Sequence, residues 1–185
     1  MRVLAVGDVC GEPGLSFLNN RLKDFRRDNH IDFCVVNGEN ANVVGITPKQ
    51  ADLILHAGAD VITLGNHTWT RTEIQPYLKE QRRILRPANY GPQCPGTGIN
   101  TFRSDFGDIC VLNLMGRFTL DSNTDNPFVI LDGYLHEIRE KIKKIHNNKS
   151  GRVDPTIIKR EYANALRIIE EKTKDITHQK LELWK

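Results

Sequence analysis

The chain has 185 residues, of which 39% are hydrophobic and 26% are charged, and its formal net charge at pH 7 is +3. This length and composition fit one domain with a sizeable apolar core. A net charge this small is not an argument for nucleic-acid binding, so we interpret the basic residues as a solvated face and expect no stable nucleic-acid partner.

Neither a membrane span nor a disulfide framework is predicted. No stretch approaches the ~20 apolar residues that a bilayer span needs, and no signal peptide precedes the first predicted strand, so we expect a cytoplasmic protein without a membrane partner. Four cysteines, Cys10, Cys34, Cys94 and Cys110, occur without a C-x-x-C pair. We interpret them as reduced, mostly buried thiols, and not as disulfides or a zinc site.

In the first half of the chain, apolar runs alternate with helical patterns. We expect strands at residues 2–7, 33–36 and 60–64, a glycine-rich turn at 11–14, and helices at 15–27 and 48–57. The apolar face of the first helix would be Leu15, Leu18, Leu22 and Phe25. Thr47 and Pro48 match the preferred start of a helix. This alternation predicts an α/β fold with a parallel sheet.

The second half has a different pattern. A short helix at 72–80 and a strand at 84–85 lead into a loop at 91–98, and two antiparallel strands are expected at 100–103 and 108–114. From residue 127 an amphipathic helix runs to about residue 144, and a second one is predicted from 154 to 174.

Polar side chains follow three of the predicted strands at the point where each one ends. Asp8 follows the first strand, Glu39 and Asn40 follow the second, and Asn66 and His67 follow the third. Parallel strands present their carboxyl ends at one edge of a sheet, so these side chains are expected to lie together. Carboxylate and amide oxygens beside an imidazole suit hard to borderline metal ions.

A structural alternative exists for each strand end. Glycine, asparagine and aspartate are common in turns and helix caps, so a single Gly-Asp or Gly-Asn needs no functional explanation. Three such endings on successive strands favour a site, and turn chemistry does not require His67.

Several motifs together resemble the YmdB-type metallophosphoesterases, which are calcineurin-like two-metal phosphodiesterases of bacteria. They are Gly7-Asp8-Val-x-Gly11-x-Pro13-Gly14, Asn37-Gly38-Glu39-Asn40-Ala41, Gly45-Ile-Thr47, Gly58-Ala-Asp60-Val-Ile-Thr-Leu-Gly65-Asn66-His67-Thr68-Trp69, Arg86-Pro87-Ala88-Asn89-Tyr90 and Pro95-Gly96-x-Gly98. The resemblance implies a metallophosphoesterase domain over residues 1–145. It also implies a calcineurin-like α/β sandwich, which in this chain would be incomplete, truncated or divergent at its C-terminus and followed by the amphipathic helices predicted above. Residues 146–185 lie beyond the match, and we interpret them as a divergent charged helical tail and not as a separate domain.

The resemblance also implies roles for the residues at the strand ends. Asp8 and Asn40 would bind a first metal ion, Glu39 would bridge to a second, and Asn66 would bind the second. His67 would protonate the leaving oxygen. The implied cofactors are two metal ions, iron or manganese, and the implied substrate is a phosphodiester such as a cyclic nucleotide.

Further histidine motifs that the family carries near its C-terminus do not occur in this chain. His136, His146 and His178 follow no apolar strand, and we interpret His136 as a helix-surface residue. Three alternatives stay open. The first is a phosphodiesterase whose missing ligands come from water or another chain. The second is a catalytically impaired relic or regulatory module that binds a single metal ion, a phosphate or a protein partner, and the third is a truncated fragment. Association of identical chains is also left open.

Overall fold

The computed structural model of the chain describes residues 1–117 and 123–148. The chain divides into two compact units, Met1–Leu135 and His136–Lys185, and the strands described below lie in the first. The helix predicted at 154–174 falls outside the described residues. In the part of the chain that the structure describes, no helix is both long and apolar enough to cross a bilayer.

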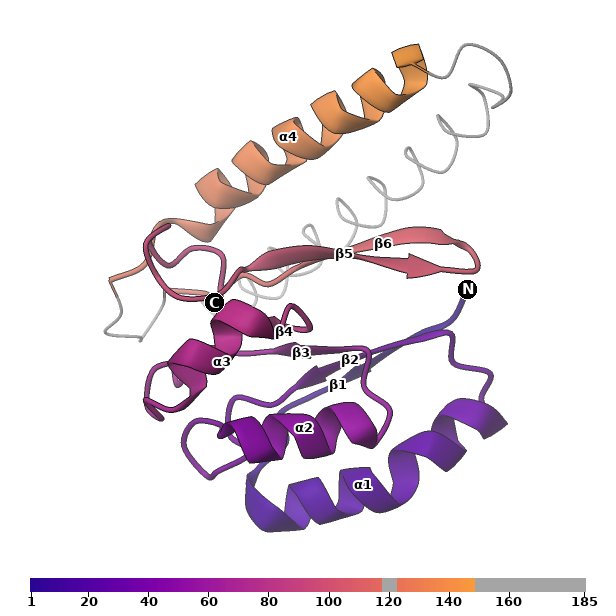
Figure 1. The fold of residues 1–185 in the computed structure, drawn as a ribbon, viewed down its shortest axis with the longest axis vertical. Helices are drawn as coiled ribbons and strands as arrows, with labels where there is room; N and C mark the ends of the chain where they lie inside the picture. The colour runs from indigo at the N-terminus through magenta and orange to yellow at the C-terminus, as the bar shows by residue number, and fades with distance from the viewer. Residues whose placement is uncertain (118–122, 149–185) are drawn as a thin grey trace, which may run out of the picture. The chain divides into compact units, whose positions relative to one another are not determined.

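A four-stranded parallel sheet forms the centre of the first unit. Its strands are β1 (Val3–Val6), β2 (Phe33–Asn37), β3 (Val61–Thr63) and β4 (Ile84–Leu85), and they lie side by side in chain order. Crossovers between parallel strands are almost always right-handed, so successive crossovers in one direction place their helices on one face. Figure 1 shows α1 (Gly11–Asp28) and α2 (Pro48–His56) together on one face of the sheet. The predicted parallel α/β sheet is confirmed.

Helix α1 differs from the prediction in where it begins and in the exposure of Phe25. It begins at Gly11, so the glycine-rich segment 11–14 forms the first helical turn and is not a separate turn. Pro13 is tolerated there because the amides of a first turn have no partner within the helix. Leu15, Leu18 and Leu22 are buried as predicted, but Phe25 is 48% exposed. Phe25 lies beside β1, the last strand of the sheet on that side, where no further strand of the described chain covers it.

Helix α2 begins with the predicted cap. The Thr47 hydroxyl accepts a hydrogen bond from the Gln50 amide at 3.3 Å, and the Gln50 side chain accepts one from the Thr47 amide at 3.0 Å. This capping box satisfies two amides that the helix leaves without partners. Ala51 and Ile54 then pack into the core. Helix α3 (Ile74–Glu80) begins two residues later than predicted and contributes Ile74 and Leu78 to the same core.

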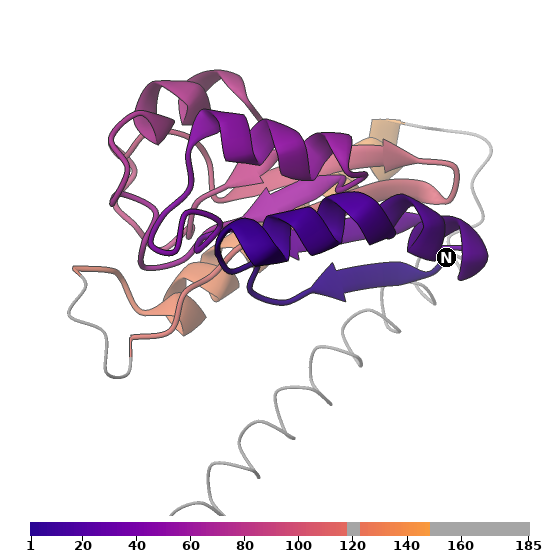
Figure 2. The same cartoon turned by 90° about the horizontal axis from the view of Figure 1, so that it is seen from below.

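An antiparallel hairpin covers the other face of the sheet. Strands β5 (Ile99–Ser104) and β6 (Gly107–Leu112) meet at a two-residue turn. Phe102 packs on Phe33 with ring centroids 5.7 Å apart, and Ile109 and Val111 contact the same cluster. The unit therefore has three layers, which are helices, parallel sheet and hairpin (Figures 1 and 2).

The hairpin also corrects the prediction for the cysteines. Only one face of β6 is covered, so Cys110, between Ile109 and Val111, points outward and is exposed. Cys10 is exposed and Cys94 is intermediate, so Cys34 alone of the four is buried. All four are free thiols, but the expectation that most are buried was wrong.

Two asparagine side chains hold the segment after β4 in place. Asn89 is fully buried, and its amide group donates to the carbonyls of Met115 and Asp125 and accepts from the Met115 amide. Asn113 donates to the carbonyls of Leu64 and Leu85 at 2.7 and 2.8 Å. The Asn113 bonds link the residues that follow β3 to the end of β4, close in the chain to Asn66 and His67.

The amphipathic helix predicted from residue 127 is present as α4 (Pro127–Asn148). It crosses the boundary between the two units. His136 is exposed on this helix, as predicted.

Candidate metal centre

The loops at the carboxyl ends of β1, β2 and β3 are tied together by backbone hydrogen bonds. The Val9 amide donates to the Asn37 carbonyl at 3.0 Å, and the Gly11 amide donates to the Asn40 carbonyl at 2.9 Å. The Gly38 amide donates to the Thr63 carbonyl at 3.1 Å. Backbone hydrogen bonds alone therefore hold the three polar strand endings next to one another, independently of their side chains.

Four of the five predicted site residues form a connected set. Asn40 Nδ2 donates to Asp8 Oδ2 at 2.7 Å, and Asn40 Oδ1 lies 2.7 Å from His67 Nδ1. The His67 amide donates to Glu39 Oε2 at 3.3 Å. Residues that are far apart in the sequence thus meet at one edge of the sheet, as the strand endings predicted.

This geometry determines which nitrogen of His67 carries the proton in the neutral ring. The Asp8 carboxylate can only accept hydrogen bonds, so Asn40 must turn its nitrogen toward Asp8 and its oxygen toward His67. His67 Nδ1 is then the donor to Asn40. The other ring nitrogen, Nε2, is left with its lone pair available for proton exchange.

Glycine at position 65 provides space and not turn geometry. A Cβ atom built there would lie 2.6 Å from Glu39 Cδ, with Oε2 closer still, and Gly65 does not adopt a positive φ. Gly38 is also confined, although less severely, since a Cβ atom would lie 3.0 Å from side-chain atoms of Ile54 and Ile62. The turn interpretation therefore does not account for these two glycines, which allow the Glu39 side chain and its loop to approach β3.

Asn66 is placed differently from the other four. It directly precedes His67, but its side chain is exposed and is not part of the hydrogen-bonded set. The structure therefore brings Asp8, Glu39, Asn40 and His67 together and leaves Asn66 at the rim.

Two further residues belong to the surroundings of the site. Cys10 donates to Asp8 Oδ2 at 3.4 Å, and this hydrogen bond is the main reason that the pKa of Cys10 is raised. Tyr90 packs against Trp69 with centroids 5.3 Å apart, and burial, followed by the negative charge of Glu39, raises the pKa of Tyr90. From the sequence we interpreted Cys10 only as a reduced thiol, although it lies two residues after Asp8 and so could have been expected beside that carboxylate.

The donor types suit a metal ion, but they are not preassembled around one. Asp8 and Glu39 supply carboxylates, Asn40 an amide oxygen and His67 an imidazole, which hard to borderline cations accept. Within residues 1–117 and 123–148, no three His, Cys, Asp or Glu side chains converge as a metal-binding group. In this arrangement Asp8 Oδ2 is occupied by its hydrogen bonds to Asn40 and Cys10.

The protein is an open α/β protein whose candidate site lies at the ends of its parallel strands. Acids, amides and a histidine stand at the carboxyl ends of these strands.

The family model described as YmdB-like protein matches residues 4–148, and the chain belongs to this family. It is 34% identical over 142 residues to the 2',3'-cyclic-nucleotide 2'-phosphodiesterase of Bacillus subtilis (strain 168). That alignment covers 76% of this chain and 53% of the relative.

Two solved structures have the same fold. A hypothetical protein from Thermus thermophilus superimposes with a TM-score of 0.68 at 37% identity, covering 74% of this chain and 53% of that one. A novel phosphatase from Mycoplasma pneumoniae gives a TM-score of 0.67 at 27% identity, covering 73% and 50%. The chain thus spans about half the length of the relatives it matches, and these relatives include a phosphodiesterase and a phosphatase.

Proposed function

We propose that this chain carries the first part of a metal-dependent phosphodiesterase centre in a calcineurin-like fold. The observation that carries the proposal is the hydrogen-bonded set Asp8, Asn40 and His67, with Glu39 bonded to the His67 backbone, at three adjacent strand ends. The family assignment supports it, because a relative at 34% identity is named a cyclic-nucleotide phosphodiesterase.

The proposed ligands follow from position and donor type. Asp8 and Asn40 would hold a first cation, Glu39 would bridge to a second, and Asn66 would complete the second site from the rim. Iron and manganese both suit oxygen donors with an imidazole nearby. When bound, a pair of cations would activate water and offset charge on the phosphate oxygens.

The chain's own residues have two tasks in this proposal. Asn40 fixes the His67 ring by accepting from Nδ1, so that Nε2 faces the site and can donate a proton to the leaving oxygen when the ring is in its protonated, imidazolium form. Imidazole suits this task because it exchanges protons near neutral pH. Gly65 leaves room for the Glu39 carboxylate beside the loop that follows β3. The proposed substrate is a phosphodiester, and the name of the Bacillus subtilis relative suggests a cyclic nucleotide.

The test combines metal content with turnover. Elemental analysis of protein purified without chelator is compared with hydrolysis of an aryl phosphodiester in the presence of manganese. We expect His67→Ala to lower turnover by about 10²–10⁴-fold with bound metal retained, because it removes only a proton donor. Glu39→Ala should lose metal as well.

His136→Ala is the matched control, since His136 is exposed on α4 and lies outside the set. Wild-type turnover in both His67→Ala and Glu39→Ala would refute the assignment.

A second candidate is a metal- or partner-binding regulatory module without turnover. It is favoured by one observation, that no three strong ligand side chains converge in the described residues. Metal bound at one ion per chain without hydrolysis would select it over the enzyme.

A further inference from the structure

The fourth parallel strand also ends at the edge of the sheet that carries the candidate metal centre. The strands lie in the order β1, β2, β3, β4, and the chain passes from β4 into Arg86 and then to Tyr90. Parallel strands present their carboxyl ends at one edge, so Tyr90 follows β4 there as Asp8 follows β1. These two residues therefore approach the site from opposite flanks.

The loop that carries Tyr90 is fixed at both of its ends by a buried arginine. Arg86 is only 6% exposed, and it donates from Nε to the Pro95 carbonyl at 3.2 Å and from Nη1 to the Pro87 carbonyl at 2.8 Å. These two bonds join the ends of loop 87–95. A side chain that binds a small ligand must be held in place by its surroundings, and this loop provides that support for Tyr90.

Tyr90 and Glu39 contact the same short loop, residues 65–69. Glu39 Oε2 accepts a hydrogen bond from the His67 amide at 3.3 Å. Tyr90 packs against Trp69, with ring centroids 5.3 Å apart and ring planes inclined at 69°. The Tyr90 hydroxyl is close enough to Glu39 for the carboxylate charge to act on it, although no hydrogen bond joins the two side chains in the described structure.

The Tyr90 hydroxyl is kept in its protonated form. Burial raises the pKa of Tyr90, the negative charge of Glu39 raises it further, and hydrogen bonding from Trp69 lowers it only in part. The indole N–H can only donate, so the phenol oxygen is the acceptor in that interaction and its own proton is left for another partner. Among residues 1–117 and 123–148, no acceptor of that proton is found. The hydroxyl is therefore available as a neutral hydrogen-bond donor at the edge of the site.

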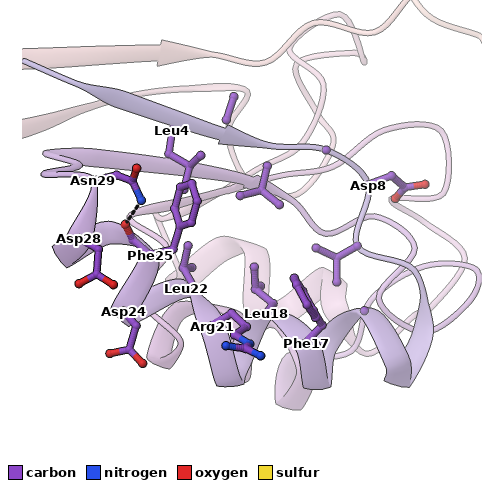
Figure 3. Close-up of a pocket in the computed structure, with 15 residues that line it drawn as sticks. Leu4, Asp8, Phe17, Leu18, Arg21, Leu22, Asp24, Phe25, Asp28 and Asn29 are labelled. Carbon is purple, nitrogen blue, oxygen red and sulfur yellow. Dashed lines mark hydrogen bonds between the residues drawn. The ribbon is translucent and has the colours of Figure 1, made fainter.

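In the part of the chain that the structure describes, the opposite flank of the site is mainly apolar. There a groove of about 830 Å³ lies between β1 and α1, and Figure 3 shows Asp8 at one end of it. Phe17 and Leu18 line the part of the groove nearer to Asp8, and Arg21 lies about one turn further along α1. A phosphate oxygen needs hydrogen-bond donors, so the Tyr90 flank is the better match for it.

We propose that Tyr90 is a substrate-binding residue of the candidate metal centre, and that its hydroxyl donates a hydrogen bond to a phosphate oxygen of the bound phosphodiester. This inference rests on the proposed phosphodiesterase function. A neutral donor suits a position near Glu39, because a lysine or arginine there would form an ion pair with that carboxylate and compete with the metal ion it is proposed to bind. Hydrogen bonds to a charged oxygen are also stronger than those between neutral groups.

The test uses the full chain and removes only the hydroxyl, since Tyr90→Phe keeps the ring that packs against Trp69. We expect inorganic phosphate, titrated by calorimetry in the presence of manganese, to bind about 10- to 100-fold more weakly, as for the loss of a hydrogen bond to a charged group. In aryl phosphodiester hydrolysis, KM should rise by a similar factor with kcat little changed, because the bond is made in the bound substrate and in the transition state alike. Manganese content and the unfolding temperature should stay at the parental values.

Tyr77→Phe is the matched control. Tyr77 donates its hydroxyl proton to Asp52 of α2, so the loss of that hydroxyl breaks a contact between helices and not one at the strand ends. This variant should bind phosphate as the parent does.

Phosphate binding separates this inference from the proposed function. Should the parent bind phosphate without hydrolysing the diester, the enzyme proposal fails, yet weaker binding in Tyr90→Phe would still support the contact. Phosphate affinity equal to the parent's in Tyr90→Phe overturns the inference, as does a parent that binds no phosphate. Loss of manganese from Tyr90→Phe would also overturn it, since the hydroxyl would then act through Glu39 and not on the substrate.

Discussion

Gly65→Ala is the most direct test of how the candidate metal centre is built. The substitution adds one methyl group at a position whose φ any residue can adopt, so the backbone itself is not strained. The added Cβ would lie 2.6 Å from Glu39 Cδ, and Glu39 Oε2 would be closer still. The neighbour that must move is therefore the carboxylate of Glu39.

The required movement sets the size of the effect. To regain ordinary van der Waals contact, the carboxylate must withdraw by roughly 1 Å, and a misplacement of this size can lower turnover by about 10²-fold. The withdrawal also breaks the hydrogen bond from the His67 amide to Glu39 Oε2, now 3.3 Å long. Because a flexible side chain can move more easily than backbone, the unfolding temperature should change little.

Three measurements check this expectation together. Metal content and aryl phosphodiester hydrolysis should both fall, and the amide signal of His67 in a proton–nitrogen spectrum should shift as its acceptor leaves. Gly7→Ala is the matched control: Gly7 also precedes a polar strand ending, but a Cβ atom there meets nothing within 4 Å. It should retain parental values in all three.

The reasoning would be refuted if Gly65→Ala kept the metal content and the His67 amide position of the parent. It would equally be refuted if Gly7→Ala caused the same losses, since the effect would then not arise from contact with Glu39.

Three further outcomes are expected. Asn113→Ala should lower the free energy of unfolding by about 1–3 kcal/mol in urea denaturation, because it removes two hydrogen bonds to backbone carbonyls. Asn100→Ala is the control, since its hydrogen bond to the Arg82 carbonyl is exposed to solvent, and its free energy of unfolding should stay within about 0.5 kcal/mol of the parent's. Burial raises the pKa of the Cys34 thiol from 9.0 to about 11, so the unfolded chain loses this proton first and stability should fall between pH 9 and pH 11. Unfolding of Cys34→Ala, followed by fluorescence at several pH values, should show a smaller decline. Thr47→Ala should lower the free energy of unfolding by about 1 kcal/mol, because the capping box is lost. Thermal unfolding of this variant is compared with that of Thr101→Ala, which changes an exposed threonine, and an equal effect in both would contradict the capping argument.

Local patterns in the sequence predicted the elements of the first unit well. Hydrophobic periodicity identified the parallel strands and the hairpin, because side-chain period reflects which face of an element is buried. The cap at Thr47 and Pro48 was readable because its chemistry involves only residues close in the chain. The start of α1 was predicted four residues late, since Gly11 and Gly14 also suit a turn and local preference does not decide between the two.

Burial was harder to predict where it depends on distant segments. Phe25 continues the apolar face of α1, yet it is half exposed because the sheet ends at β1. Cys110 sits in an apolar run, yet it points outward because only one face of the hairpin is covered. In both cases the hydrophobic pattern correctly predicted the helix or strand. Whether a given side chain is buried depends on which other element packs over it, and only the whole fold decides that.

The sequence by itself determined the parallel α/β class, the family and the polar residues at three strand ends, because each of these depends on residues that are neighbours in the chain. Only the tertiary structure decided that Asn40 links Asp8 to His67, that Glu39 needs the space left by Gly65, and that Asn66 lies at the rim. These relations join loops that are distant in the chain, as the separations of 32 and 27 residues in the two Asn40 hydrogen bonds illustrate. Side-chain distances at this scale are set by strand register and packing, which a linear pattern does not contain.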